Sequence, residues 1–201
     1  MLNLLKYIKQ SCPWIWYVIE YFNGLLIKLF YGQRIKLAVQ DALSAKDVIL
    51  YEYRQLQPED TGILLELISN QPVGFDKYFS PHPFDFKNFQ RVLSNGTFVL
   101  IGAFDNNDLV GYCFIRFFVN KSAFRGKIVD YKYQGRGIAK QMGQIMTNIA
   151  SEAGFRVYAT ISKSNVASLQ SAKAGSKIEV IKELPDNYLY IEILKDPNYV
   201  S

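Results

Sequence analysis

Residues 129–139 constrain the fold of this chain more than any other segment. They read Val-Asp-Tyr-Lys-Tyr-Gln-Gly-Arg-Gly-Ile-Ala, and they pass from strand-forming residues through two glycines into a helical pattern. Glycine permits a positive φ angle and leaves room for a ligand beside the backbone. The free N–H groups at the start of a helix, together with the helix dipole, favour an anion. The stretch therefore predicts a phosphate-binding turn between a strand and a helix.

The helix after this turn is predicted from apolar residues at helical spacing, namely Ile138, Met142, Ile145, Met146 and Ile149. Two common phosphate motifs do not fit the turn. No Gly-Lys-Ser/Thr follows, as a P-loop requires, and the third glycine of the dinucleotide fingerprint is missing. At this point an ordinary strand-to-helix turn that contains glycine remains the alternative interpretation.

Composition and charge narrow the class of ligand. The chain has 201 residues, 49% of them hydrophobic, which predicts one domain with an appendage. A net charge of +5 would suit nucleic acid, an anionic membrane surface or a polyanionic cofactor. Basic residues gather around the glycine turn, and this favours a compact phosphate ligand over nucleic acid. They are Lys121, Arg125, Lys127, Lys132, Arg136 and Lys140.

The cysteine and histidine content argues against two kinds of site. Two cysteines, at positions 12 and 113, are too few and too far apart for a disulfide framework. With a single histidine beside them, no metal site is predicted. We therefore expect a protein of the reducing cytoplasm.

Residues 1–46 are predicted to form a hydrophobic helical extension, and residues 47–201 the main domain. Glu20 and Lys28 interrupt the apolar run, and each would cost about 2.5–3.5 kcal/mol near the centre of a bilayer, so a spanning helix is not expected. Two interpretations stay open. Residues 1–40 pack on the domain or on a second copy of the chain as a homodimer, or they make a peripheral membrane contact at the inner surface.

The remaining elements follow from periodicity and turn residues. Strands are predicted at residues 47–56, 97–104, 109–118, 124–131, 156–162, 177–184 and 188–194. Helices are predicted from the Pro-containing start at 57–61 to Asn70, at 86–93, from Ile138 onward, and at 165–174 before Gly175. Residues 71–84 contain several prolines and are predicted to be a loop.

This order of elements resembles that of the GCN5-related N-acetyltransferases, the GNAT superfamily. Gln134-x-x-Gly137-x-Ala139 is similar to their Q/R-x-x-G-x-G/A pyrophosphate motif. Asn165-x-x-Ser168 is similar to their N-x-x-S helix, although Asn165 would also serve as a plain helix cap. The resemblance covers about residues 47–195. It implies an α/β (α+β) GNAT fold, with a mixed, mostly antiparallel sheet that is splayed at the acetyl-CoA site and flanked by helices.

The resemblance also implies an acetyl-CoA-dependent N-acetyltransferase. Backbone groups of Ile128 and Val129 would pair with the pantetheine and the thioester carbonyl, and Asn165 would contact the pantetheine arm. The amide of Val129 would also stabilise negative charge on the carbonyl oxygen. The pyrophosphate would be held by the amides of Gln134, Gly135, Arg136, Gly137, Ile138, Ala139 and Lys140.

The residue that accepts the proton of the attacking amine is less clearly indicated. His82 lies in the loop that lines the acceptor site in this superfamily, and histidine titrates near neutrality. A turn residue with a satisfied backbone bond is the alternative interpretation of His82, and Asp130, Tyr131 or a chain of water molecules are alternative bases. Many members place a tyrosine acid seven residues after the asparagine, where this chain has Ala172. Ser176 also stands where phenylalanine is common.

The predicted acceptor is a primary amine of a small molecule. Aromatic residues of the loop and the hairpin would stack on a sugar or nucleotide ring, or belong to the core. The run Phe-Ser-Pro-His-Pro-Phe at 79–84 resembles members that acetylate amino sugars, so an amino sugar or sugar nucleotide is one hypothesis. A peptide or protein N-terminus is the alternative acceptor. A non-catalytic acyl-CoA-binding module is the alternative function.

Overall fold

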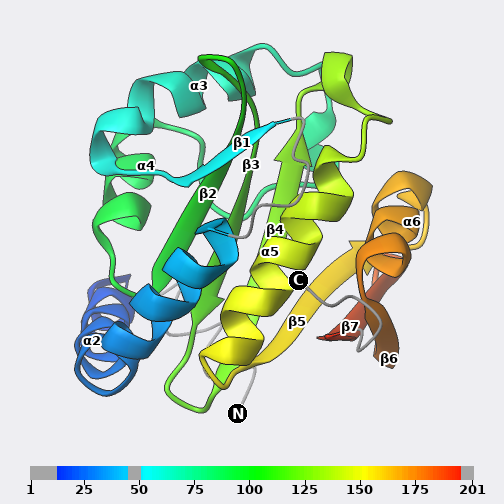
Figure 1. Ribbon diagram of the computed structural model, residues 1–201. Helices are drawn as coiled ribbons and strands as arrows, with labels where there is room; N and C mark the ends of the chain where they lie inside the picture. Colours follow the sequence, from blue (N-terminus) through cyan, green and yellow to red (C-terminus); the bar gives the residue numbers. More distant parts are fainter. Residues whose placement is uncertain (1–12, 45–50, 196–201) are drawn as a thin grey trace.

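Seven strands form a single sheet in the order β1-β2-β3-β4-β5-β7-β6 (Figure 1). The computed structural model describes residues 13–44 and 51–195. The strands are β1 (Glu52–Gln55), β2 (Phe98–Asp105), β3 (Asp108–Phe117), β4 (Ser122–Val129), β5 (Arg156–Ser162), β6 (Lys177–Leu184) and β7 (Tyr188–Leu194). Every pairing is antiparallel except that of β4 with β5. The predicted mixed, mostly antiparallel sheet is therefore confirmed.

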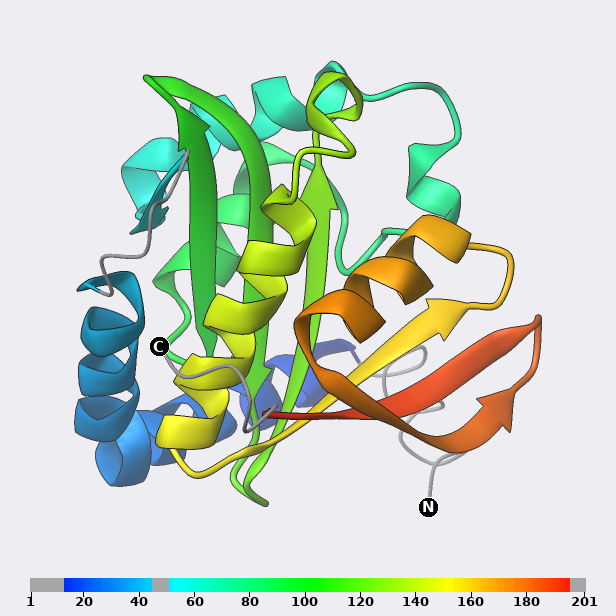
Figure 2. The same cartoon turned by 45° about the vertical axis from the view of Figure 1, so that its right-hand side comes forward.

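Helices cover both faces of this sheet (Figures 1 and 2). On one face, α2 and α5 share a core with β2, β3, β5 and β7, and α3 and α4 pack on the other face. The helices are α2 (Pro13–Ser44), α3 (Thr61–Ser69), α4 (Phe86–Ser94), α5 (Ile138–Glu152) and α6 (Val166–Gly175). Three short 3-10 turns join them, η1 (Pro58–Asp60), η2 (Phe75–Lys77) and η3 (Tyr131–Tyr133).

The sequence pattern explains why the central strands lie inside. β2 reads Phe-Val-Leu-Ile-Gly-Ala-Phe-Asp, a nearly continuous apolar run that is typical of a strand buried on both faces. Val99, Ile101 and Ala103 join the core on the α5 face, whereas Leu100 and Phe104 join the core under α3 and α4. β2 therefore lies between the two cores and contributes side chains to both.

β4 and β5 separate soon after they begin. Their parallel pairing consists of Ser122 with Arg156, Ala123 with Val157 and Phe124 with Tyr158. Beyond Tyr158, β5 keeps its pairing with β7 on its other edge. The C-terminal halves of β4 and β5 therefore diverge, and Figure 2 shows the gap between them. The splay that the resemblance implied is present.

Most element boundaries agree with the prediction, with two differences. β4 ends at Val129 and not at residue 131, because the carboxylate of Asp130 accepts the N–H of Lys132 at 2.9 Å and caps η3. The predicted loop 71–84 contains η2. The first predicted strand is described only from β1 onward, since residues 47–50 lie outside the described part of the chain.

α2 is one bent helix of 32 residues that packs against the domain (Figure 2). Ile27, Ile35 and Val39 are buried in the core that α5 also enters. Within the described residues, no helix combines the length and apolar character needed to cross a membrane. A domain boundary at residue 46 stays a prediction, but α2 and α5 share one hydrophobic core.

Phe155 joins α2 to the rest of this core, and this contact gives a testable prediction. Its ring lies 5.0 Å from that of Tyr31 and 4.8 Å from that of Phe117, and the residue is 5% exposed. We expect Phe155→Ala to lower the free energy of unfolding by about 3–5 kcal/mol, because it removes a buried ring and leaves a cavity. Chemical denaturation measures this change. Phe86→Ala is the control, because Phe86 is 60% exposed and its loss should cost no more than about 0.5 kcal/mol.

Candidate active site

The glycine turn lies at the end of β4 and presents backbone donors to solvent. Gly135 has φ 79° and Gly137 has φ 83°, angles that only glycine adopts readily, and a Cβ at either position would meet no atom within 4 Å. No side chain caps α5, so the N–H groups of Ile138 and Ala139 have no helical partner. The turn therefore combines open space with free donors at the positive end of a helix dipole.

Exposed cations surround this turn. Lys132, Arg136 and Lys140 are all exposed. The guanidinium of Arg136 lies 4.6 Å from the ring centroid of Tyr133, and its Nη2 donates to the carbonyl of Lys132 at 3.2 Å. An anion bound at the turn would meet positive charge in addition to the backbone donors.

The backbone of Val129 faces the splay. The N–H of Asp130 donates to the carbonyl of Val110 at 2.9 Å, and Val129 lies opposite Gly111 in the ladder. Because hydrogen-bonded and non-hydrogen-bonded pairs alternate in antiparallel strands, the N–H and C=O of Val129 point away from β3, toward β5. β5 has already diverged here, so these two groups meet no strand partner.

The same alternation of hydrogen-bonded and non-hydrogen-bonded pairs separates the two residues of β4 that were predicted to bind the cofactor, Ile128 and Val129. Ile128 lies opposite Tyr112 in a hydrogen-bonded pair, so its backbone groups are used inside the sheet. Lys127 and Val129 are the residues whose backbone groups turn toward the opening. A ligand in the splay would therefore pair with Val129 and Lys127, and would reach Ile128 only through its side chain.

Arg125 and Lys127 are not part of the exposed basic cluster that the sequence predicted, and this is a correction. Their side chains alternate inward and bond to helices. Nη1 of Arg125 donates to the carbonyl of Gly143 and to Oγ1 of Thr147, both at 2.5 Å. Nζ of Lys127 donates to the carbonyl of Ala139 at 2.6 Å and to Oγ of Ser171 at 2.7 Å. The two cations therefore fasten β4 to α5 and α6.

Arg125 is buried and Lys127 is half-buried, and neither forms an ion pair with a carboxylate in the described part of the chain. Burial, and then the nearby charge of Arg125, lower the pKa of Lys127 to about 7. Burial likewise lowers the pKa of Arg125 to about 10 and raises the pKa of the Cys113 thiol to about 12. Cys113, which pairs with Lys127 in the ladder, therefore remains a neutral thiol and supplies no counter-ion near neutral pH.

Two glycines let the helices approach these side chains. A Cβ on Gly143 would lie 3.2 Å from Nζ of Lys127, so glycine leaves space in α5 for the ammonium group. A Cβ on Gly175 would lie 3.0 Å from the carbonyl oxygen of Lys140, so glycine lets α6 lie against the start of α5. Gly175, singled out in the sequence as a helix end, is also a packing residue.

Asn165 caps α6. Its Oδ1 accepts the N–H of Ser168 at 3.0 Å, so it fulfils the structural role of its motif beyond the C-terminal end of β5. Ala172 is buried, and Ser176 is buried and bonded through Oγ to the carbonyl of Gly175 at 2.7 Å. Neither position offers an acid.

Residues 71–85, which we call the crossing loop, bridge the two sides of the splay on the face opposite α5. A Cβ on Gly126 of β4 would lie 3.2 Å from the Phe79 ring. Farther along, the hydroxyls of Tyr78 and Ser164 lie 3.3 Å apart, and the Tyr188 hydroxyl donates to the carbonyl of Lys77 at 3.0 Å. The loop thus contacts β4 at one point and the region beyond β5 at another (Figure 2).

His82 lies in the crossing loop, one layer away from β4. Its Nδ1 lies 2.8 Å from the carbonyl of Pro83, and burial lowers its pKa. Its ring is 5.6 Å from that of Phe84 and 4.9 Å from that of Phe89. Phe84 in turn stacks on Phe79, the residue that packs over β4. Asp130 directly follows Val129 in the chain, whereas the ring contacts of His82 are with Phe84 and Phe89.

Two features of this site were missed in the sequence. Arg125, Lys127 and Val129 alternate along β4, so their side chains lie on one face of the strand. This alternation was visible in the sequence, but the predicted basic cluster included Arg125 and Lys127 without regard to it. The position of Phe79 over Gly126 joins residues far apart in the chain, and no local pattern indicates it.

Comparison with known proteins gives one family model, described as the acetyltransferase (GNAT) family, that matches residues 63–175. No curated protein sequence matches the chain. The GNAT domain of S. lividans PAT is similar in structure, with a TM-score of 0.62 at 17% identity over 72% of this chain and 90% of that chain. The paia N-acetyltransferase from Thermoplasma acidophilum, in complex with coenzyme A, has a TM-score of 0.62 at 15% identity over 74% and 100%.

A third solved structure has a named acceptor. The aminoglycoside acetyltransferase AAC(6')-Ib, in complex with coenzyme A and kanamycin, has a TM-score of 0.58 at 12% identity, covering 72% of this chain and 94% of that chain. At these identities the three structures show a shared fold. The family match and the shared fold confirm the GNAT resemblance noted in the sequence.

The lowered pKa of Lys127 predicts a pH dependence of stability. Between pH 7 and the ordinary lysine pKa of 10.5, the unfolded chain binds a proton that the folded chain does not, so the Lys127 contribution favours folding as the pH rises. Relative to Lys127→Met, the wild-type unfolding free energy should gain up to about 1.4 kcal/mol per pH unit above pH 7. Denaturant titrations of both proteins from pH 6 to 9 measure the difference. Lys132→Met, at an exposed position, keeps Lys127, so its curve should run parallel to that of the wild type. A Lys127→Met curve that also runs parallel to the wild type would contradict the prediction.

Proposed function

Because the chain belongs to the GNAT acetyltransferase family, we propose that it transfers the acetyl group of acetyl-CoA to a primary amine of a small molecule. The observation that carries this proposal is the splay between β4 and β5, where the N–H of Val129 points into the opening next to the glycine turn. An unpaired strand edge beside a free helix start suits a ligand with both an amide-bearing arm and a phosphate end. Coenzyme A has both.

The residues present fit acetyl-CoA, which would supply the acetyl group as a thioester. Backbone groups of Val129 and Lys127 would pair with the pantetheine arm, and Asn165 lies beyond the open end of β5. The amides of residues 134–140, with the side chains of Arg136 and Lys140, would hold the pyrophosphate. The absence of a Cβ at Gly135 and Gly137 leaves the space for it.

Val129 would assist the reaction through its backbone. When the amine attacks the thioester carbonyl, a C–N bond forms and negative charge develops on the oxygen. One fixed N–H aimed at that oxygen stabilises the charge, and it needs no side chain. The C–S bond then breaks and releases the coenzyme A thiolate, whose pKa, about 8.5 for an ordinary thiol, lets it leave without an acid from α6. Holding both reactants in the splay supplies much of the remaining rate enhancement.

The attacking amine must give up a proton to a base. Two of the predicted bases, Asp130 and His82, lie in different surroundings. Asp130 directly follows Val129, although one of its carboxylate oxygens accepts the N–H of Lys132. The ring of His82 packs on Phe84 and Phe89, and its Nδ1 lies 2.8 Å from the carbonyl of Pro83. We therefore propose Asp130, acting directly or through water, as the base, with His82 as a residue that orders the crossing loop.

The acceptor would enter on the face that the crossing loop covers. Phe84 stacks on Phe75 and on Phe79 there, and the three half-buried rings leave some apolar surface beside β4. Such a surface suits the face of a sugar ring that carries an amine. The aminoglycoside acetyltransferase AAC(6')-Ib, whose solved structure contains kanamycin, has the same fold, and this supports an amino sugar or aminoglycoside-like acceptor. A peptide N-terminus is the second candidate.

Turnover tests the proposal against a non-catalytic acyl-CoA-binding module. The purified chain is incubated with acetyl-CoA and a panel of amines, amino sugars first, and release of free thiol is measured. Thiol release that depends on one amine supports the enzyme. Tight coenzyme A binding without turnover on any amine would favour the module.

Gly137→Val tests the pyrophosphate turn. Valine adds side-chain atoms where a phosphate would lie and is strained at positive φ, so we expect the KM for acetyl-CoA to rise at least about tenfold, or 1.4 kcal/mol. Gly154→Val is the matched control, because Gly154 has φ 84° and lies just beyond the other end of α5. A folded Gly137→Val protein with the KM of the control would refute the turn as a cofactor site.

His82→Gln separates the two candidate bases. We expect the acid limb of the pH profile of kcat/KM to stay in place, with a modest loss of stability from the altered ring contacts. Asp130→Asn, by contrast, should lower kcat by about 100-fold or more, which is typical for loss of a general base. Disappearance of the acid limb in His82→Gln alone would assign the proton to His82.

A further inference from the structure

The side of α2 that faces away from the domain is apolar and exposed. Ile27 on the opposite side is fully buried, while Leu29 is 71% exposed and Tyr21 is 70% exposed. The exposed residues recur at three- and four-residue spacing, so they share one face of the helix. We call this set the outer face of α2, formed by Tyr21, Phe22, Leu25, Leu26, Leu29 and Phe30.

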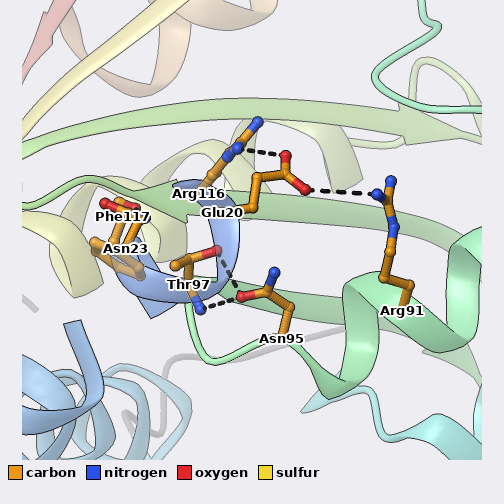
Figure 3. A network of polar contacts seen from close by, with 7 residues as sticks. All are labelled: Glu20, Asn23, Arg91, Asn95, Thr97, Arg116 and Phe117. Atoms are coloured by element: carbon orange, nitrogen blue, oxygen red, sulfur yellow. Dashed lines mark hydrogen bonds and ion pairs between the residues drawn. The ribbon is translucent and has the colours of Figure 1, made fainter. Parts of the chain in front are cut away.

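The outer face is held in this orientation by polar contacts on the inner side of α2. The carboxylate of Glu20 accepts from Nη2 of Arg116 at 2.8 Å and lies 3.5 Å from Nη1 of Arg91 (Figure 3). One turn farther along, Nδ2 of Asn23 donates to the carbonyl of Phe117 at 3.2 Å, and its Oδ1 accepts the N–H of Val119 at 3.3 Å. Turning the outer face inward would break these bonds and leave Arg116 without its carboxylate.

The charged side chains that α2 exposes to solvent before Asp41 are all positive. Glu20 is the only acidic residue between positions 13 and 40, and its side chain is only 14% exposed because it is paired inward. Lys28 and Lys36 are exposed on the same helix. Toward solvent, α2 therefore combines large apolar side chains with positive charge and carries no acidic group before Asp41.

This combination distinguishes between two occupants. A contact between two copies through this face would gather the lysines of both helices, and neither helix offers an accessible carboxylate before Asp41 to pair them. An anionic bilayer offers acyl chains for the apolar residues and phosphates for the lysines. We propose that the outer face of α2 binds the surface of an anionic membrane, with the helix lying in the plane of the interface.

Vesicle flotation of the full chain tests this proposal without any measurement of activity. Vesicles of phosphatidylcholine with phosphatidylglycerol are compared with vesicles of phosphatidylcholine alone. We expect the chain to float with the anionic vesicles and to bind less as salt is added. Phe22→Ser/Leu29→Ser/Phe30→Ser should lower the partition coefficient at least about tenfold, since three large apolar groups no longer enter the interface.

The matched control is Val180→Ser/Ile181→Ser, which removes two exposed apolar side chains from β6, 55% and 47% exposed, and should bind like the wild type. Circular dichroism and thermal unfolding of both variants show whether they are folded. Equal flotation of the α2 variant and the wild type would overturn the proposal, as would failure of the wild type to float. A wild-type dimer that the α2 variant converts to a monomer, with no vesicle binding by either, would assign the face to a second copy instead.

Discussion

Hydrogen bonds from Arg125 and Lys127, two cations on the inward face of β4, join this strand to the helices beside the splay. Once β5 diverges after Tyr158, β4 has no strand on that edge, and these bonds add to the apolar packing of Ala123 and Val129 against α5. Buried charges without a carboxylate are costly, and an all-apolar contact would avoid that cost. The polar contact nevertheless satisfies the carbonyls of Gly143 and Ala139 while the strand edge at Val129 stays free.

Much of the fold was predictable from the sequence because its signals are local. Alternation and apolar runs located the strands, and the glycine turn located the start of α5. The site was only partly predictable. The proposed pyrophosphate turn depends on two glycines at positive φ, and the sequence shows the glycines directly. The alternation that turns the backbone groups of Val129 outward and those of Ile128 toward β3 depends on the register with β3. The position of His82 depends on ring packing within the crossing loop, which no periodicity encodes.

The hydrophobic residues of α2 lie in two environments, the core of the domain and the exposed surface. The sequence of residues 13–44 has no narrow apolar stripe, so composition alone left packing, dimerisation and membrane contact as alternatives. The structure divides the helix by side. Ile27, Ile35 and Val39 enter the core of the domain, and Glu20 fixes the rotation of the helix about its axis. The remaining apolar residues are then left outward as a consequence of that rotation.

The crossing loop spans the splay between β4 and β5. It packs Phe79 over Gly126, two residues beyond the paired part of β4, and it reaches the region beyond β5 through the Tyr78 hydroxyl and the Lys77 carbonyl. The contact of the loop with the region beyond β5 consists of two exposed hydrogen bonds, each worth about 0.5–1.5 kcal/mol. We therefore expect these two bonds to break more readily than the sheet or its packing against α5, so that the crossing loop can move while both keep their places.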